Sequence, residues 1–403
     1  MNEFVERRIA LPPSPAPQRS YDVVIIGGGG HGLATAYYLA ARHGITNVAV
    51  LERRYIGAGN SGRNTTVIRA NYGIPEAVAF YQRSVELYEG LEAELDRAVM
   101  HRTKGLLWLA HCEATLRTEK ARAVLNTACG AQTEFVEPDE IARLCPLLDL
   151  EGGGQFPVLG ASYHPRGATA RHDRVIWGYA EGAIRRGVHV HQGVEVTGLV
   201  RDGDRVTGVE TRAGRIGAGV VLGAVGGHVT TLAAMAGVRL PIRTHPLQAA
   251  VTNHYPQTLG PVVISSDLLV YVSQTPRGEL LFGAEIDRQA SYSYRSGVDF
   301  LQNCALRAIT LLPFMRRLRL LRQWVGVCDM SPDYSPIMGE TGADGFLITT
   351  GWGTWGFKAI PAGGEQMAAT IAAGRPTELI APFALDRFAR DRTKADRGSA
   401  GTH

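Results

Sequence analysis

The sequence has few cysteines, and no apolar run in it is long enough to cross a bilayer. Five cysteines are spread over 403 residues without any C-x-x-C pair: Cys112, Cys129, Cys145, Cys304 and Cys328. An odd number of widely spaced cysteines disfavours a disulfide framework and a zinc site. The N-terminus lacks the apolar core of a signal peptide. We therefore expect a cytoplasmic protein with reduced thiols, no metal and no membrane contact.

The net charge is also small. It is +4, from 42 basic and 38 acidic residues, which is too mild a balance to indicate a nucleic-acid partner. Basic residues cluster only in RRLRLLR at 316–322, which we interpret as the polar face of a helix. The sequence contains no G-x-S-x-G and no spaced set of metal ligands.

The length and the composition indicate two domains. A chain of 403 residues exceeds a single ordinary core, and 45% hydrophobic with 20% charged residues is typical of a globular protein.

The most informative segment is residues 21–52. An apolar run, YDVVII, precedes Gly27, Gly29 and Gly32 in G-x-G-x-x-G spacing, and a helix-forming segment and a second strand follow. The first glycine permits a tight turn, the second lets the backbone approach a pyrophosphate, and the third lets helix and strand pack closely. Glu52 lies 20 residues after Gly32, where a carboxylate can bond a ribose hydroxyl. The segment predicts a dinucleotide site on a strand–helix–strand unit.

Other segments predict the elements that surround this unit. Helical patterns occupy 75–99, 113–129, 138–144, 173–186 and 361–373. The apolar run 220–225, followed by a Gly-Gly turn and a helix, resembles a third parallel strand. Residues 194–200 and 206–211 form a strand pair. From 245 the pattern alternates as in antiparallel strands at 246–252, 262–265, 269–273 and 279–284. Helices are expected within 296–320.

These patterns predict an α/β plus α+β fold with a discontinuous, Rossmann-like cofactor domain and a second, mainly antiparallel domain. We expect an extended arm at 1–20 and a tail at 391–403. The cofactor domain should comprise 21–75, 150–240 and 330–390, and a substrate or interface domain 76–149 and 241–329.

Two cations stand out near the predicted cofactor site. Arg69 follows the small, polar segment GNSGRNTTVI, and its planar fork of donors suits a carboxylate, although a surface ion pair explains it equally well. Lys358 ends a second glycine-rich turn, Gly351 to Lys358, whose Gly351, Gly353 and Gly356 allow close approach to a ring. Such a turn before a helix suits the anionic edge of a reduced flavin, and Lys358 beside it could stabilise developing negative charge.

The motifs together resemble one family. YDVVIIGGGGHGLATAYYLA, GNSGRNTTVIRANY, HPRGATARHD, THPLQA and GWGTWGFKAIPAGGE resemble the β subunit of heterotetrameric sarcosine oxidase, within the D-amino acid oxidase-like flavin amine oxidases. The resemblance spans about residues 20 to 390. It implies non-covalent FAD at the following matching positions: Gly30, His31, Glu52, Asn60, Ser61, Thr65, Val67, Val196, Gly353, Gly356 and Lys358.

The resemblance also implies a second flavin. By composition alone His172, in TARHD, is a structural histidine; by the resemblance it carries a covalent FMN at the interface with an α subunit. A neutral imidazole is a competent nucleophile for that attachment, with Asp173 or Arg171 tuning it. Arg69 and Lys358 would hold the carboxylate of sarcosine. Tyr271 and His245 are candidates for the wall of the pocket.

The implied reaction oxidises sarcosine to glycine with a one-carbon unit, formaldehyde or methylenetetrahydrofolate. Electrons would pass from FAD to FMN, and oxygen would become hydrogen peroxide. The implied partners are an α subunit that binds NAD and tetrahydrofolate, with γ and δ subunits. Trp355 departs from the expected pattern, because it places a large ring inside the second turn.

Two other interpretations stay open on the residues alone. A single-FAD dehydrogenase or oxidase of D-amino acids or glycine would keep Arg69 and Lys358 without a covalent flavin. A non-catalytic electron-transfer or scaffold subunit would need no carboxylate clamp. The preferred N-methyl amino acid is not encoded in any motif.

Overall fold

The computed structural model describes residue 11 and residues 14–395. The predicted arm at 1–20 and tail at 391–403 therefore lie partly outside the described residues. Within them, Ser14 Oγ accepts a hydrogen bond of 2.8 Å from the backbone N–H of Val190, so residue 14 lies against a strand of the first sheet. No helix in the described part of the chain is long and apolar enough to cross a membrane.

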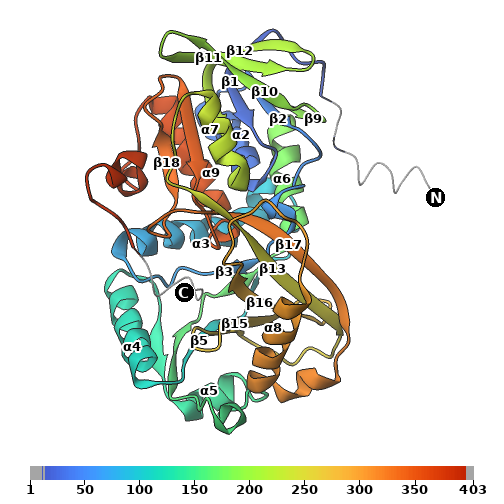
Figure 1. Cartoon of the computed structure of the whole chain (residues 1–403), viewed down its shortest axis with the longest axis vertical. Coiled ribbons are helices and arrows are strands. Elements are labelled where there is room, and N and C mark those ends of the chain that lie inside the picture. The colour runs from blue at the N-terminus through green and yellow to red at the C-terminus, as the bar shows by residue number, and fades with distance from the viewer. Residues whose placement is uncertain (1–10, 12–13, 396–403) are drawn as a thin grey trace, which may run out of the picture.

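The first sheet has eight strands and contains the predicted cofactor unit (Figure 1). Its strands are β1 (Ser20–Ile26), β2 (Val48–Glu52), β9 (His189–Gln192), β10 (Val196–Asp202), β11 (Arg205–Thr211), β12 (Gly214–Gly223), β18 (Ile337–Glu340) and β19 (Phe346–Thr350). The strands β9, β2, β1, β12 and β19 are parallel neighbours in that order. β10 and β11 extend the sheet antiparallel from β12, and β18 pairs antiparallel with β19.

This sheet is buried on both faces because β1 alternates between two cores. Val23 and Ile25 pack into the core shared with the helices, whereas Val24 and Ile26 pack into the core on the other face. A strand covered on both faces is apolar over its buried residues, which explains the run VVII at 23–26; Asp22, which precedes it, is exposed. The helices are α2 (Gly30–His43), α3 (Pro75–Leu95), α4 (Glu113–Ala128), α5 (Pro138–Leu144), α6 (His172–Ile184), α7 (Val229–Met235), α8 (Val298–Leu311) and α9 (Ile360–Ala373).

The second sheet is mainly antiparallel and lies in the lower half of Figure 1. In spatial order it contains β17 (Leu320–Met330), β13 (Arg243–His254), β16 (Glu279–Ile286), β15 (Val270–Gln274), β14 (Val262–Ser265), β5 (Leu106–Ala110), β7 (Gly160–His164) and β6 (Glu134–Val136). A small third sheet contains β3 (Val67–Ile68), β8 (Ala168–Thr169) and β4 (Arg102–Thr103). The predicted fold class is confirmed, while the domain boundaries stay a prediction.

The interpretation of residues 316–322 as a helix face is wrong. α8 ends at Leu311, and Pro313 begins a 3₁₀ turn, Pro313–Arg317, that contains Arg316 and Arg317. A proline lacks the N–H that would continue an α-helix. Arg322 lies in β17, which pairs antiparallel with β13. The basic residues therefore span a turn and an edge strand rather than one helical face.

Candidate functional site

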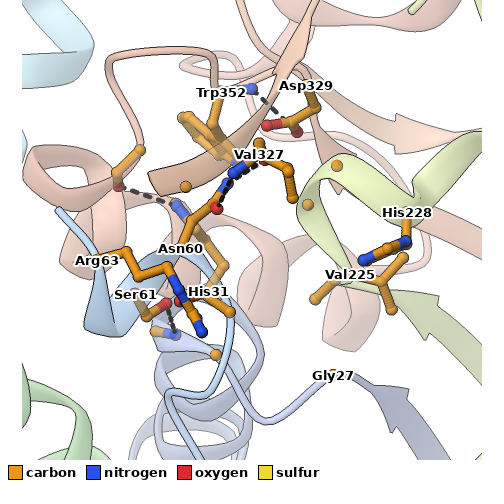
Figure 2. Close-up of a pocket in the computed structure, with 18 of the residues that line it drawn as sticks. Gly27, His31, Asn60, Ser61, Arg63, Val225, His228, Val327, Asp329 and Trp352 are labelled. Atoms are coloured by element: carbon orange, nitrogen blue, oxygen red, sulfur yellow. Dashed lines mark hydrogen bonds between the residues drawn. The ribbon is translucent and has the colours of Figure 1, made fainter. Parts of the chain in front are cut away.

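A cavity of about 360 Å³ lies where the two glycine-rich turns meet. The first turn contributes Gly27, Gly29 and Gly30, and the second contributes Gly353 and Gly356. Figure 2 shows the first turn, the segment at Asn60 and Ser61, and the strand at Val327 converging on this space. The two predicted turns are thus brought to one site although they are more than three hundred residues apart in sequence.

The first turn can only be built from glycine at two positions. Gly27 has φ of 112°, and a Cβ added there would lie 2.4 Å from the carbonyl oxygen of Ala224. A Cβ on Gly32 would lie 2.2 Å from the carbonyl oxygen of Gly27. Gly32 does not line the cavity; it lets α2 pack against the turn, as its place in the motif predicts.

Glu52 and Ser61 orient this turn from the cavity wall. Glu52 Oε2 accepts the N–H of Gly28 at 2.9 Å, and its Oε1 accepts the N–H of Arg54 at 2.8 Å. Ser61 Oγ accepts the N–H of Gly30 at 2.9 Å. Each carboxylate oxygen has a further lone pair for a hydroxyl group. A carboxylate held at this place fits the ribose of a dinucleotide.

His31 ties the first turn to the second. Its Nε2 lies 3.0 Å from the carbonyl oxygen of Gly356, and its ring stacks on Trp352 at 4.1 Å between centroids. Because a carbonyl only accepts, Nε2 carries the proton. Burial lowers the pKa of His31 to about 3, against the opposing effect of the bond to Gly356. His31 is therefore a neutral imidazole in a fixed tautomer that spans both halves of the site.

Asn60 joins the first turn region to the second sheet. Its Oδ1 accepts the N–H of Val327 at 2.8 Å, and its Nδ2 donates to the carbonyl oxygen of the same residue. The amide thus pairs with β17 as a neighbouring strand would (Figure 2). Close by, the guanidinium of Arg63 stacks over the ring of Tyr294 at 4.9 Å.

Lys358 lines the cavity and Arg69 does not. Lys358 is 8% exposed, and its Nζ donates to the carbonyl oxygen of Thr354 at 3.1 Å. Arg69 is 3% exposed; its guanidinium donates to Asn71 and lies 4.1 Å over Tyr72 and 4.7 Å over Trp108.

The two cations influence each other. Burial, and next the charge of Arg69, hold the pKa of Lys358 well below its usual range. A second cation close by in a dry site is a cost that an anionic ligand would offset. Arg69 directly follows β3 and is a buried residue, not a surface one.

Of five further residues predicted to form the site, four line the cavity and one does not. Thr65, Val67, Val196 and Tyr271 line the cavity, whereas His245 is held by the carbonyl oxygen of Asp287 at 2.9 Å outside it. Burial raises the pKa of the Tyr271 phenol, and a hydrogen bond with Thr65 opposes that rise. The phenol is therefore neutral at any physiological pH.

The large ring of Trp355 does not obstruct the site. Trp355 is 2% exposed and packs edge-on against Tyr72 at 4.7 Å and Tyr81 at 5.8 Å, in the core behind the turn. The cavity is lined instead by its neighbours Thr354 and Gly356. Gly351 also lies outside the lining, at the start of the turn.

His172 lies apart from this cavity, at the first residue of α6. It is half-buried, and burial lowers its pKa, while Asp173 raises it and Arg171 lowers it. Arg171 donates two hydrogen bonds to Asp173, of 2.9 and 2.8 Å. The imidazole is therefore neutral near pH 7, as a nucleophile must be.

Some lining residues are not predicted as site residues from the sequence. Asp329 and His228 line the cavity and stand in no motif, whereas Arg63 lines it from within the segment GNSGRNTTVI and Trp352 from within the second glycine-rich turn. Asp329 and Val327 lie on β17, which no motif marks. The run of Val325, Val327 and their small neighbours could have indicated a strand by its β-branched content. Within the described residues, no three His, Cys, Asp or Glu side chains gather as a metal site.

Comparisons with known proteins agree with this geometry. The family model described as FAD dependent oxidoreductase matches residues 22–370. The chain is 43% identical to the sarcosine oxidase subunit beta of an Arthrobacter species over 387 residues, 96% of each chain. It is 44% identical to the protein of the same description from Rhodobacter capsulatus over 375 residues, 93% of this chain and 90% of that one.

Among solved structures, the L-proline dehydrogenase from P. horikoshii superposes with a TM-score of 0.88 at 28% identity. The match covers 94% of this chain and all of that one.

Proposed function

The chain belongs to the FAD dependent oxidoreductases and, within them, to the sarcosine oxidase β-subunit family, and from this membership we propose that it oxidises sarcosine to glycine. The one-carbon product is formaldehyde or methylenetetrahydrofolate, and the reduced product of oxygen is hydrogen peroxide. The observation that carries the proposal is the single cavity that unites the first glycine turn, Glu52 and Lys358.

The residues present fit FAD. The glycines allow the cofactor to approach the backbone, Glu52 is positioned for a ribose, and His31 holds the two turns together. The cavity wall also contains five of the residues that the resemblance implies for FAD: Asn60, Ser61, Thr65, Val67 and Val196. When bound, FAD supplies the acceptor for the two electrons and the hydrogen removed from the amine.

Lys358 and Arg69 would bind the substrate carboxylate. Lys358 faces the cavity directly, and Arg69 lies behind it among aromatic rings. A bound carboxylate would favour the protonated form of Lys358, which favours an amino acid over a neutral amine. Tyr271, neutral and half-buried, would form another part of the wall.

His172 would carry a covalent FMN. A neutral, half-buried imidazole at a helix start, flanked by a paired arginine and aspartate, suits attachment to the flavin 8α carbon. The FMN would pass electrons from FAD to oxygen. Since His172 lies outside the main cavity, this second flavin would need a partner surface, and the implied assembly has an α subunit that binds NAD and tetrahydrofolate, with γ and δ subunits.

A titration tests the substrate. Sarcosine added anaerobically to the purified flavoprotein should bleach the flavin absorbance, and a non-oxidisable thioether acetate should perturb it without bleaching. If no small amino acid perturbs the spectrum, the chain is an electron-transfer or scaffold subunit instead.

Acid denaturation tests the second flavin. Flavin colour should remain with the acid-precipitated chain, and the intact mass should exceed that of the sequence by one FMN. His172→Asn should release the colour, whereas His43→Asn, at an exposed site in α2, should not. If the wild-type chain releases all of its flavin, the protein is a single-FAD oxidase or dehydrogenase of an amino acid.

A further inference from the structure

Asp329 accepts hydrogen bonds from several residues at the start of the second glycine turn. Its Oδ2 accepts from Thr350 Oγ1 at 2.8 Å, from the N–H of Gly351 at 2.7 Å and from the N–H of Trp352 at 3.2 Å. Its own carbonyl oxygen accepts the N–H of Gly353 at 3.1 Å. Four consecutive residues are thus bound to one residue that is 1% exposed and lines the cavity. Figure 2 shows Asp329 beside Trp352.

These bonds join the two sheets at the site. Asp329 lies near the end of β17 in the antiparallel sheet, and Thr350 is the last residue of β19 in the parallel sheet. The N–H groups of residues 351–353 are already engaged by Asp329. Thr354 follows them, lines the cavity, and accepts a hydrogen bond at its carbonyl oxygen from the Nζ of Lys358.

We propose that Asp329 is a positioning residue that holds the second glycine turn, and through Thr354 the amine of Lys358, in the geometry needed for substrate oxidation. Ionised acceptors make stronger hydrogen bonds than neutral ones, so a carboxylate holds three converging donors more firmly than an amide would. Burial raises the pKa of the Asp329 carboxyl, and the bonds from Thr350, Trp352 and Gly351 oppose that rise.

The test compares Asp329→Asn with Asp333→Asn. Both carboxylates are buried at 1% and 3% exposure, but Asp333 pairs with Arg387 and does not line the cavity. Asp329→Asn should slow flavin reduction at saturating sarcosine by about 10- to 100-fold, as a 1 Å misplacement typically does. It should also shift the flavin absorbance and weaken FAD binding. Asp333→Asn should lower stability and leave the limiting rate and the spectrum unchanged.

A milder variant keeps the test decisive if Asp329→Asn does not fold. Thr350→Val preserves the side-chain shape and removes one of the donors to Oδ2, so it should change the same quantities in the same direction by a smaller factor. Asp329→Asn or Thr350→Val with the wild-type spectrum, FAD affinity and limiting rate would overturn the proposal. Only the rate readout rests on the proposed function, because FAD affinity and absorbance are measured without sarcosine.

Discussion

Substitution of Lys358 by methionine tests whether a buried amine binds the substrate carboxylate. The amine is 8% exposed, and burial together with the charge of Arg69 holds its pKa well below the usual range. A bound carboxylate favours the protonated form, since it supplies the opposite charge at close range. Binding of an anion should therefore be accompanied by proton uptake.

The direction and the size of the pH dependence of binding follow from this proton uptake. Above the pKa of Lys358 in the free enzyme, each binding event takes up one proton, so the dissociation constant should rise about tenfold per pH unit. Below that pKa the dissociation constant should be independent of pH. A hydrogen bond between charged groups contributes about 1.5–3 kcal/mol, so Lys358→Met should weaken binding by about 10- to 150-fold.

The assay uses (methylthio)acetate, which has the carboxylate but no titratable amine. Its affinity is measured from the change in flavin absorbance at a series of pH values between about pH 6 and about pH 9, all below the usual lysine pKa. Lys104→Met is the control, because Lys104 is also partly buried but donates to the carbonyl oxygen of Gln274 outside the cavity. A Lys358→Met protein that keeps both the affinity and the pH slope would refute the assigned role.

Two further pairs of substitutions test the scaffold. Gly32→Ala should reduce FAD affinity by at least about 100-fold in a cofactor titration, because its Cβ would lie 2.2 Å from a backbone oxygen. The control, Gly90→Ala, adds a Cβ in open space on a helix and should stabilise the chain by about 1 kcal/mol. Asp333→Asn should lower the free energy of unfolding in urea by about 3–5 kcal/mol, because it leaves the charge of Arg387 unpaired in the core. The control, Asp344→Asn, removes an exposed ion pair and should lower it by less than about 1 kcal/mol. Burial raises the pKa of Asp333, but the effect of Arg387 is larger and the net pKa is lowered. The stability that this pair contributes is therefore present above the usual carboxyl pKa and is lost as the pH falls through the lowered value. A wild-type chain with the same acid unfolding profile as Asp333→Asn would contradict this.

The sequence predicts the geometry of the first glycine turn well because the contacts that determine it are local. The first turn, its helix and Glu52 lie within about thirty residues. Gly27 and Gly32 of the motif stand where a Cβ would clash with a backbone oxygen, as the motif predicts. The antiparallel strands from 243 to 286 follow from their alternating pattern.

β17 was not predictable in the same way. It begins directly after the basic segment 316–319, which follows a helix and a proline, and its pairing partner β13 is about eighty residues away. The contacts of Asn60 with Val327 and of Asp329 with the second turn exist only once that pairing forms. The burial of Arg69 behind the cavity likewise depends on Trp108, from a strand of the other sheet.

The order of the strands in the first sheet also constrains how the chain acquires its cofactor during synthesis. β1, at residues 20–26, pairs with β12 near residue 220, and β12 in turn pairs with β19 at residues 346–350. Contacts of such long sequence separation form slowly, and their edges stay unpaired in the nascent chain. The cavity can be completed only after the second glycine turn, at residues 351–356, has left the ribosome.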